Sequence, residues 1–416
     1  MTVKKSFRIF ALTMALVLTF GALCCESVFA EGLDGIMSFA AEKTLEAVGG
    51  DTVKKQTAEK IPQEDVILAD ESGQVRITEK TPLLDENGKL TKAGYCFTNM
   101  YEYDRSAIKA NGSRIKEWDF YQISNGRYCL QITWADISLA GNASLGLFDM
   151  ETGERWDVAD IKLLTFGKYG VSADAMEPHT LSRHKKNFDL DINVTEGKRT
   201  ITFEGKAKKE KFTVDLSMEM FPDHESLIMA LPFDRGNDKQ FYFNQKVNCM
   251  PVSGTVKVGD KEITFDPSDS FCVLDWGRGV WPYHENWYWG NGSTKLEDGS
   301  IFGFEIGWGF GDMSAATENT LFYNGKAHKI GEIYLNEDKF ETENWMDPWV
   351  FTSSDGRFEM TMTPIYDNIT KARVICVGNI CHQVFGLWNG TVILDDGTVL
   401  EIKDMTAFCE DSDNMW

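Results

Sequence analysis

The chain has 416 residues and a formal net charge of −22, from 64 acidic and 42 basic residues. Such an acidic chain lacks the basic face that nucleic-acid phosphates require, and it is equally unsuited to an anionic membrane surface as a whole. The length exceeds the roughly 250–300 residues over which one hydrophobic core grows, so two domains are expected.

The first 30 residues have the pattern of a cleavable export signal. Lys4, Lys5 and Arg8 precede a nearly unbroken apolar run at 9–23, and Val28-Phe29-Ala30 suits a signal peptidase. The run is shorter than the about 20 residues that a membrane-spanning helix needs. We therefore expect cleavage after residue 30, a secreted or extracytoplasmic location, and no stable membrane span after cleavage. An uncleaved N-terminal anchor is the alternative.

Residues 31–76 are predicted to form a short helix and a linker. Apolar residues recur at spacings of three and four over 33–48, and Gly49-Gly50 ends the pattern. Residues 51–75 are polar and lack a sustained period, which is typical of a linker.

From residue 77 onward, short runs of alternating apolar and polar residues indicate strands. The clearest examples are 127–136, 198–204, 211–220 and 226–233. Turn dipeptides that favour tight hairpins follow at 259–260, 298–299, 324–325, 355–356 and 396–397. Regular hairpins without helices predict sandwiches or closed barrels. We place a boundary at Met250-Pro251, which gives one β domain at 77–250 and a second at 251–416.

Seven cysteines remain after the leader, an odd number that makes a poor disulfide framework. They show no metal-binding spacing, and buried free thiols are at least as good an interpretation as bridges. They are Cys96, Cys129, Cys249, Cys272, Cys376, Cys381 and Cys409.

Tryptophan is concentrated in one segment, residues 275–290, and this segment is the best candidate for a ligand pocket. Large apolar faces with a few ionisable groups are typical of such pockets. A structural plug at the end of a barrel is the alternative, since an arginine also stacks on tryptophan for structural reasons. The candidate ligand-binding residues are Trp276, Arg278, Trp281, Tyr283, Trp287 and Trp289, with Trp308 and Glu318 further along.

Ordered short motifs link the chain to a known family. They are Leu83-Leu84-Asp85 with Gly88 and Leu90, Lys116-Glu117-Trp118-Asp119, Ala135-Asp136-Ile137, DWGRGVWPY at 275–283, Trp287-Tyr288-Trp289, Ala316-Thr317-Glu318-Asn319, Phe385-Gly386, Asp395-Asp396-Gly397 and the closing 408–416. With these motifs the sequence resembles the bacterial domain-of-unknown-function 2804 family from about residue 81 to residue 416.

That family looks like a distant relative of the lipocalin-like two-barrel proteins, which include carotenoid hydratases and tocopherol cyclases. The resemblance implies an all-β chain of two lipocalin-like (calycin-type) antiparallel barrels or sandwiches with a short N-terminal helix. It also implies an apolar cavity for a small molecule. It implies no single reaction, and no catalytic residue is carried over from those relatives.

Three residues are candidates for proton transfer to or from a bound ligand: Asp275, His284 and Glu305. A buried acid among aromatic rings would suit the protonation of an alkene. Asp275 would serve if burial raised its pKa, but a pair with Arg278 would make it a structural clamp, which we favour. Glu305 lies on a glycine-lined strand face that a ligand can approach closely. His284 is more typical of a surface position.

Other chemistries find little support. The glycine-rich 307–311 lacks a phosphate-loop lysine, no G-x-S-x-G elbow occurs, and the histidines are dispersed, so we expect no cofactor and no metal site. The leading hypothesis is a secreted binder of an apolar or amphipathic small molecule. The alternatives are a cofactor-independent hydratase, isomerase or cyclase, and a carbohydrate or cell-surface interaction protein.

Overall fold

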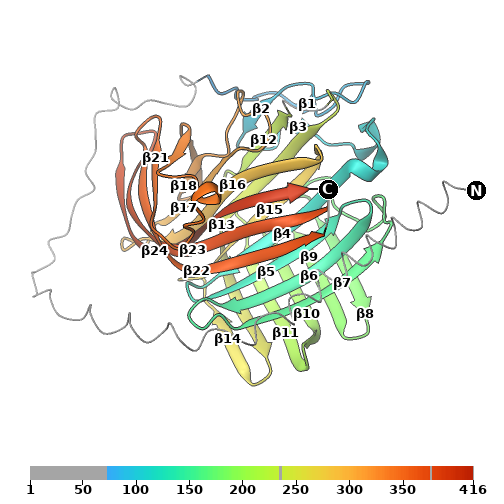
Figure 1. Cartoon of the computed structure of the whole chain (residues 1–416), viewed down its shortest axis with the longest axis vertical. Coiled ribbons are helices and arrows are strands. Elements are labelled where there is room, and N and C mark those ends of the chain that lie inside the picture. The colour runs from blue at the N-terminus through green and yellow to red at the C-terminus, as the bar shows by residue number, and fades with distance from the viewer. Residues whose placement is uncertain (1–72, 234–236, 375–376, 416) are drawn as a thin grey trace, which may run out of the picture.

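The computed structural model of the chain describes residues 73–233, 237–374 and 377–415. The predicted leader, the predicted helix at 33–48 and Cys376 lie outside these residues. Within them nearly all regular structure is β strand, and Figure 1 shows two curled sheets that face one another. The prediction of an all-β fold is therefore confirmed, as two antiparallel half-barrels consistent with a lipocalin-like pair. None of the described helices has the length and apolar character needed to cross a membrane.

The first sheet has 13 strands in the order β7-β6-β5-β4-β15-β13-β11-β10-β9-β8, with β12 and β14 paired to β13 and β2 paired to β12. The strands are β2 (Gly94–Cys96), β4 (Ile115–Ser124), β5 (Tyr128–Asp136), β6 (Ala140–Asp149), β7 (Arg155–Leu163), β8 (His179–Lys185), β9 (Phe188–Thr195), β10 (Lys198–Ala207), β11 (Glu210–Glu219), β12 (Leu227–Pro232), β13 (Phe241–Val258), β14 (Lys261–Phe265) and β15 (Phe271–Val280).

The second sheet has nine strands in the order β19-β18-β17-β16-β24-β23-β22-β21-β20. They are β16 (His284–Lys295), β17 (Ile301–Trp308), β18 (Thr320–Tyr323), β19 (Lys326–Lys329), β20 (Ile333–Leu335), β21 (Trp349–Ser353), β22 (Phe358–Val374), β23 (Val377–Ile393) and β24 (Val399–Met415). Outside both sheets, β1 (Thr81–Pro82) pairs with β3 (Tyr101–Glu102). Single helical turns occur at Arg105–Ala107, Gly112–Arg114 and α2 (Lys339–Thr342).

The turn dipeptides connect strands as expected. Each of the five lies between two consecutive antiparallel strands, from the β13–β14 hairpin to the β23–β24 hairpin. At Asn324 and Gly325 the φ angles are 47° and 80°, and both central residues of a tight type I′ turn need positive φ. The four strand segments predicted most clearly correspond to β5, β10, β11 and β12.

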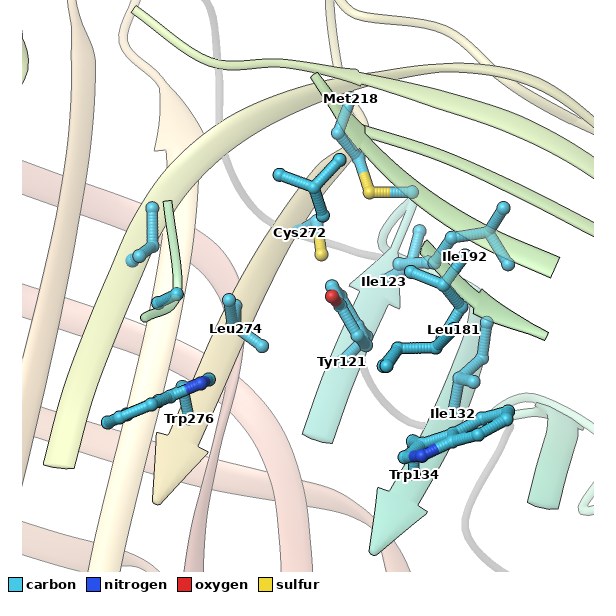
Figure 2. Packing of buried hydrophobic residues seen from close by; sticks show 14 of the residues in the cluster. Tyr121, Ile123, Ile132, Trp134, Leu181, Ile192, Met218, Cys272, Leu274 and Trp276 are labelled. Carbon is cyan, nitrogen blue, oxygen red and sulfur yellow. The ribbon is translucent and has the colours of Figure 1, made fainter. Parts of the chain in front are cut away.

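The interior of the first sheet is filled by apolar side chains. Figure 2 shows side chains from β4, β5 and β15 directed toward others from the strands opposite, with Tyr121, Leu274 and Trp276 among them. All three are at most 1% exposed. The second sheet encloses its own core, in which Trp388 stacks on Phe351 with ring centroids 4.6 Å apart. Each half-barrel is therefore packed internally, which leaves little room for a ligand inside the first one.

The chain passes from the first sheet to the second between β15 and β16. The expected domain boundary at Met250-Pro251 falls within β13, whose 18 residues run through it. A change of sheet is not by itself a change of domain, so the division into 77–250 and 251–416 stays a prediction.

An apolar cluster joins the outer faces of the two sheets. Phe148 on β6 contacts Phe385 on β23 with ring centroids 5.4 Å apart, and Phe120 on β4 lies 6.2 Å from Trp289 on β16. Trp289 in turn packs against Phe408 on β24 at 4.9 Å. Each strand in this region is thus covered on both faces: its inner face packs on the core of its own half-barrel, and its outer face packs on the other sheet.

The six described cysteines are all free thiols, and all but Cys381 are buried. This outcome matches the thiol interpretation of the sequence for these six positions.

We predict that Phe385→Ala weakens the contact between the sheets. Removing this ring, which is 1% exposed, should lower the free energy of unfolding by about 3–5 kcal/mol. Chemical denaturation would measure the change. Phe340→Ala is the matched control because that ring is 43% exposed, and its effect should be small. Equal effects of the two substitutions would contradict a structural role for the inter-sheet cluster.

Candidate functional site

A cavity of about 400 Å³ lies between the facing sides of the two sheets, and we call it the inter-sheet cavity. Its walls come from β4, β5, β12, β13 and β15 of the first sheet and from β16, β17, β22, β23 and β24 of the second. The volume falls within the range of pockets that enclose small molecules. The inter-sheet cluster of phenylalanines and Trp289 closes the cavity on one side, because Phe120 and Trp289 belong to both.

One wall of the inter-sheet cavity is aromatic. Trp281 lies at its centre, with ring centroids 5.0 Å from Trp118, 6.1 Å from Trp287 and 4.7 Å from Phe310. Tyr242 extends the wall, with its ring 4.8 Å from Phe310. Most of these pairs meet edge to face, so flat ring surfaces remain available to a ligand.

A second part of the wall is polar, and its side chains form a hydrogen-bonded chain between the sheets. Gln131 on β5 donates to the side-chain oxygen of Gln383 on β23 at 2.5 Å. Asn368 on β22 also donates to that oxygen, at 3.1 Å. Gln383 then donates to Glu410 on β24 at 3.0 Å. Amide groups therefore connect a first-sheet strand to a carboxyl group in the cavity wall.

A buried lysine, Lys246 on β13, carries positive charge into the cavity wall. Its Nζ lies 3.1 Å from Oδ1 of Asp275 and 3.9 Å from Oε1 of Glu318, and 4.0 Å from the ring centroid of Trp289. Burial acts to lower the pKa of Lys246, but the neighbouring carboxylates outweigh it and raise the pKa. The lysine therefore stays charged although it is only 2% exposed.

Asp275 has its oxygens occupied by donors. Besides Lys246, it accepts hydrogen bonds from Trp118 Nε1 at 3.1 Å and from Asn244 Nδ2 at 2.5 Å. Glu318 accepts one from the Tyr242 hydroxyl at 3.0 Å, and burial raises its pKa. This geometry makes Asp275 a partner of the lysine ammonium rather than a donor of protons.

Glu305 lies behind the cavity wall, fully buried. Trp289 Nε1 donates to it at 2.6 Å, Asn291 Nδ2 at 2.9 Å and Asn248 Nδ2 at 3.0 Å. Burial raises its pKa to about 8 although Lys246 acts in the opposite direction. Its contacts hold Trp289 in place, so its effect on a ligand would be indirect.

Glu410 is the carboxyl group in the cavity wall that is best placed for proton transfer. It accepts from Trp287 Nε1 at 2.9 Å on one oxygen and from Gln383 on the other. Burial raises its pKa to about 7, and these two donors only partly oppose the shift. A carboxyl group with that pKa exchanges its proton near neutral pH, which is the property of a general acid or base.

Lys116 on β4 lines the cavity with Ile137, close to the end of β5. It is 2% exposed, and its Nζ donates to the carbonyl of Ile137 at 3.4 Å. Burial lowers its pKa to about 7.

The structure brings together six of the residues that the sequence singled out. Asp275, Trp281, Trp287, Trp289, Trp308 and Glu318 all line the inter-sheet cavity. Strand geometry explains three of the six, because alternate residues of a strand share a face and thus Asp275 on β15 and Trp287 and Trp289 on β16 point to the facing sheet.

Four other candidates lie elsewhere. Trp276 and Arg278 point into the first half-barrel, where the guanidinium lies 3.9 Å from the indole centroid. Tyr283 is 44% exposed, and the His284 side chain is 54% exposed with Nε2 3.0 Å from Asp413 Oδ1.

The expected clamp between Asp275 and Arg278 does not form. The two residues are three apart on β15 and therefore point to opposite faces of the sheet. Arg278 instead pairs with Asp119 on β4 at 2.9 Å and donates to the carbonyl of Trp118 on the same strand and to that of Ser172, between β7 and β8.

Sequence reasoning missed Lys246, Tyr242 and Glu410. Glu410 lies in the closing family motif at 408–416, whose acidic composition is typical of an exposed edge, but Cys409, Glu410 and Asp411 are all at most 8% exposed. They belong to the second half of β24, which lies between β16 and β23 and is paired with both. The acidic composition of this segment does not predict that it is buried. Its burial results from pairing with a strand on each side, and that pairing cannot be seen in the sequence.

Within the described ranges, no group of three His, Cys, Asp or Glu side chains is arranged to hold a metal ion. The polar groups that line the cavity are amides, carboxyls, hydroxyls, the Cys381 thiol and two lysines.

Comparison with known proteins gives one family and a set of distant structural likenesses. The model of DUF2804, described as a domain of unknown function, matches residues 74–416. Kievitone hydratase from Nectria haematococca has 10% identity and a TM-score of 0.42, over 81% of this chain and 98% of that one. A protein provisionally assigned as AttH from Nitrosomonas europaea has 13% identity and a TM-score of 0.41, over 80% and 98%. No curated protein matches the sequence.

We predict that Glu410 makes stability fall as the pH rises. Its pKa is raised from 4.5 to about 7, so between these values the unfolded chain has lost the proton that the folded chain keeps. Stability from this group is present below about 4.5 and is lost as the pH rises through about 7. Glu410→Gln should therefore be stabilised relative to the native protein, and more so at the upper end of this window.

Thermal unfolding across this pH range would measure the difference. Glu401→Gln, an exposed position on the same strand, is the matched control and should show no such trend. A gap between Glu410→Gln and the native protein that stays constant with pH would exclude the proposed titration.

Proposed function

Since the chain belongs to the DUF2804 family, whose function is unknown, we propose a function from the geometry of the site: the protein binds an amphipathic small molecule in the inter-sheet cavity. The observation that carries this proposal is the division of the cavity into an aromatic wall and a polar wall. A flat apolar body fits the first, and a group that forms hydrogen bonds fits the second.

The charges of the cavity indicate which polar group suits it. Lys246 is shared between Asp275 and Glu318, so its single positive charge faces two carboxyl groups. Glu410 adds a third carboxyl group on the polar wall. An anionic group placed beside Lys246 would meet the Asp275 and Glu318 carboxyl groups at low dielectric, which is costly. Hydroxyl, amide or amine groups are therefore better suited to this wall than a carboxylate.

We predict that the uncharged fluorescent probe N-phenyl-1-naphthylamine binds in this cavity and that its emission rises on binding. Thr133→Phe should reduce probe affinity about tenfold or more, because Thr133 lines the cavity and a ring there occupies the ligand's space. Titration of probe emission would measure the affinity.

Thr213→Phe is the matched control for this experiment. Thr213 lies on β11 of the same sheet, is also half-buried and does not line the cavity, so its substitution should leave the affinity unchanged. A native protein that leaves the probe's emission unaltered would remove the basis of the proposal.

A second function, proton transfer to or from the bound molecule, is favoured by Glu410. Its pKa is raised, and hydrogen bonds from Trp287 and Gln383 hold its carboxyl group in place. Both properties suit a general acid or base in a cofactor-independent isomerase, hydratase or cyclase. Asp275, with its oxygens occupied, and Glu305, behind the wall, suit this role less well.

We predict for this second function that a ligand extracted from the protein of its own host takes up deuterium from D₂O when it is returned to the native protein. Glu410→Gln should bind the ligand but slow the exchange at least about a hundredfold, and Glu401→Gln should not. Mass spectrometry of the ligand measures the exchange. Equal exchange with native protein and Glu410→Gln would exclude Glu410 as the proton-transfer group.

We also propose that the chain is exported and that its leader is removed after residue 30. The supporting pattern is the basic start, the apolar run at 9–23 and the small or apolar residues before the cleavage position. N-terminal sequencing of the protein from its host should begin at Glu31. A chain that keeps Met1 and sediments with membranes would instead support an N-terminal anchor.

A further inference from the structure

The last two residues of β7 and the turn that follows them expose three bulky apolar side chains together. In this segment, the 162–168 loop, Leu163 is 44% exposed, Leu164 46% and Phe166 40%. Isolated apolar residues on a protein surface need no explanation, but neighbouring ones that share a single loop often mark an interaction site.

The backbone of the 162–168 loop is held in place, so the exposure is built into the fold. The amide of Leu164 donates to the carbonyl of Leu139 at 2.7 Å, and that of Phe166 to the carbonyl of Ser138 at 2.9 Å. Between them Thr165 is buried, and its hydroxyl donates to Asp136 at 2.8 Å. The loop thus turns the Thr165 side chain inward and its three bulky apolar side chains outward.

This arrangement has a conformational cost. Leu164 and Phe166 have φ angles of 58° and 46°, in the left-handed region that bulky residues avoid. Such strain persists only where the surrounding contacts impose it, and it is concentrated at functional segments. Two strained apolar residues directed into solvent indicate a surface that is covered in use.

The exposed charges beside the apolar side chains are positive, whereas Asp136, which accepts the hydrogen bond from Thr165, is buried. Lys162 and Lys168 flank the apolar residues, both are exposed, and in the described part of the chain neither has a carboxylate within 4 Å. The guanidinium of Arg105 packs against Gly167, but its charge is paired with Glu117 at 2.7 Å. The chain as a whole is acidic, but charges farther away than about 8 Å are largely screened at physiological ionic strength. A negatively charged surface that touches the loop therefore meets mainly its lysines.

The loop also lies beside one end of the inter-sheet cavity. Its hydrogen-bond partners Ser138 and Leu139 directly follow Ile137, which lines the cavity together with Lys116. A surface in contact with the loop would therefore be close to this end of the cavity.

From these observations we infer that the 162–168 loop docks on the surface of an anionic lipid bilayer. Leu163, Leu164 and Phe166 enter the boundary between headgroups and acyl chains, and Lys162 and Lys168 lie at the level of the phosphates. A lipid surface satisfies both parts of the loop, since it offers apolar volume behind a negatively charged layer. The inference stands apart from the proposed ligand and holds whether or not the cavity binds one.

The test is co-sedimentation with vesicles of equimolar phosphatidylcholine and phosphatidylglycerol, compared with vesicles of phosphatidylcholine alone. The native protein should partition preferentially to the anionic vesicles. Leu164→Ser combined with Phe166→Ser should lower partitioning about tenfold or more, because the apolar contact is lost. Lys162→Glu combined with Lys168→Glu should remove the preference for anionic vesicles.

The matched control is Val350→Ser combined with Ile365→Ser. These side chains are 39% and 40% exposed on the second sheet, so they remove similar apolar surface outside the loop and should leave partitioning unchanged. Every variant keeps the same N-terminal residues, so any contribution of the leader is common to all. Unaltered thermal unfolding of the variants would show that they fold normally.

Three results would overturn the inference. The native protein could fail to sediment with either vesicle, or the loop variants could sediment like the control. Alternatively, the native protein could form a dimer in solution that Leu164→Ser with Phe166→Ser dissociates, which would assign the loop to a second copy of the chain.

Discussion

The arrangement of the site depends on strands that are covered on both faces. In an isolated curled sheet one face of each strand packs on the core and the other meets water. Here the outer faces of β4, β15, β16 and β24 meet each other across the inter-sheet cluster instead. β13 shows the consequence, with its first twelve residues all buried. Where the two curved faces diverge, side chains no longer fill the space between them, and the inter-sheet cavity lies there.

Polar groups on those outer faces are buried between the sheets. Each ionisable one therefore either needs a partner of opposite charge or has a shifted pKa. The Lys246 ammonium is tolerated because Asp275 and Glu318 lie beside it. An unpaired charge at that position would be strongly destabilising. Glu410 has weaker compensation, from an indole and an amide, so its pKa rises to about 7. One wall of the cavity therefore combines a permanent ion pair with a carboxyl group that can gain or lose a proton.

The sequence predicts the fold well because hairpin turns and alternating runs are local signals. Asn324 and Gly325 identify their turn directly, and the motifs around 275–289 identify the family. Pairing between distant strands has no local signal, so Lys246 and Glu410 appear as ordinary charged residues until β13 and β24 are placed. The wrong prediction of an Asp275–Arg278 pair has a different origin. The two residues are close in sequence, but side chains alternate between the faces of a strand, so residues three apart point in opposite directions.

The order in which the strands pair has a consequence for folding kinetics. Residue 124 pairs with residue 271 where β4 meets β15, and Gly290 pairs with Cys409 where β16 meets β24. Such contacts require closure of long loops before they contribute any stabilisation, which makes them slow to form. The hairpins at the sheet edges can assemble early, whereas the central strands around the inter-sheet cavity must wait for partners far along the chain. During that interval β15 and β16 present apolar residues on both faces, so this region is the one most exposed to aggregation before folding is complete.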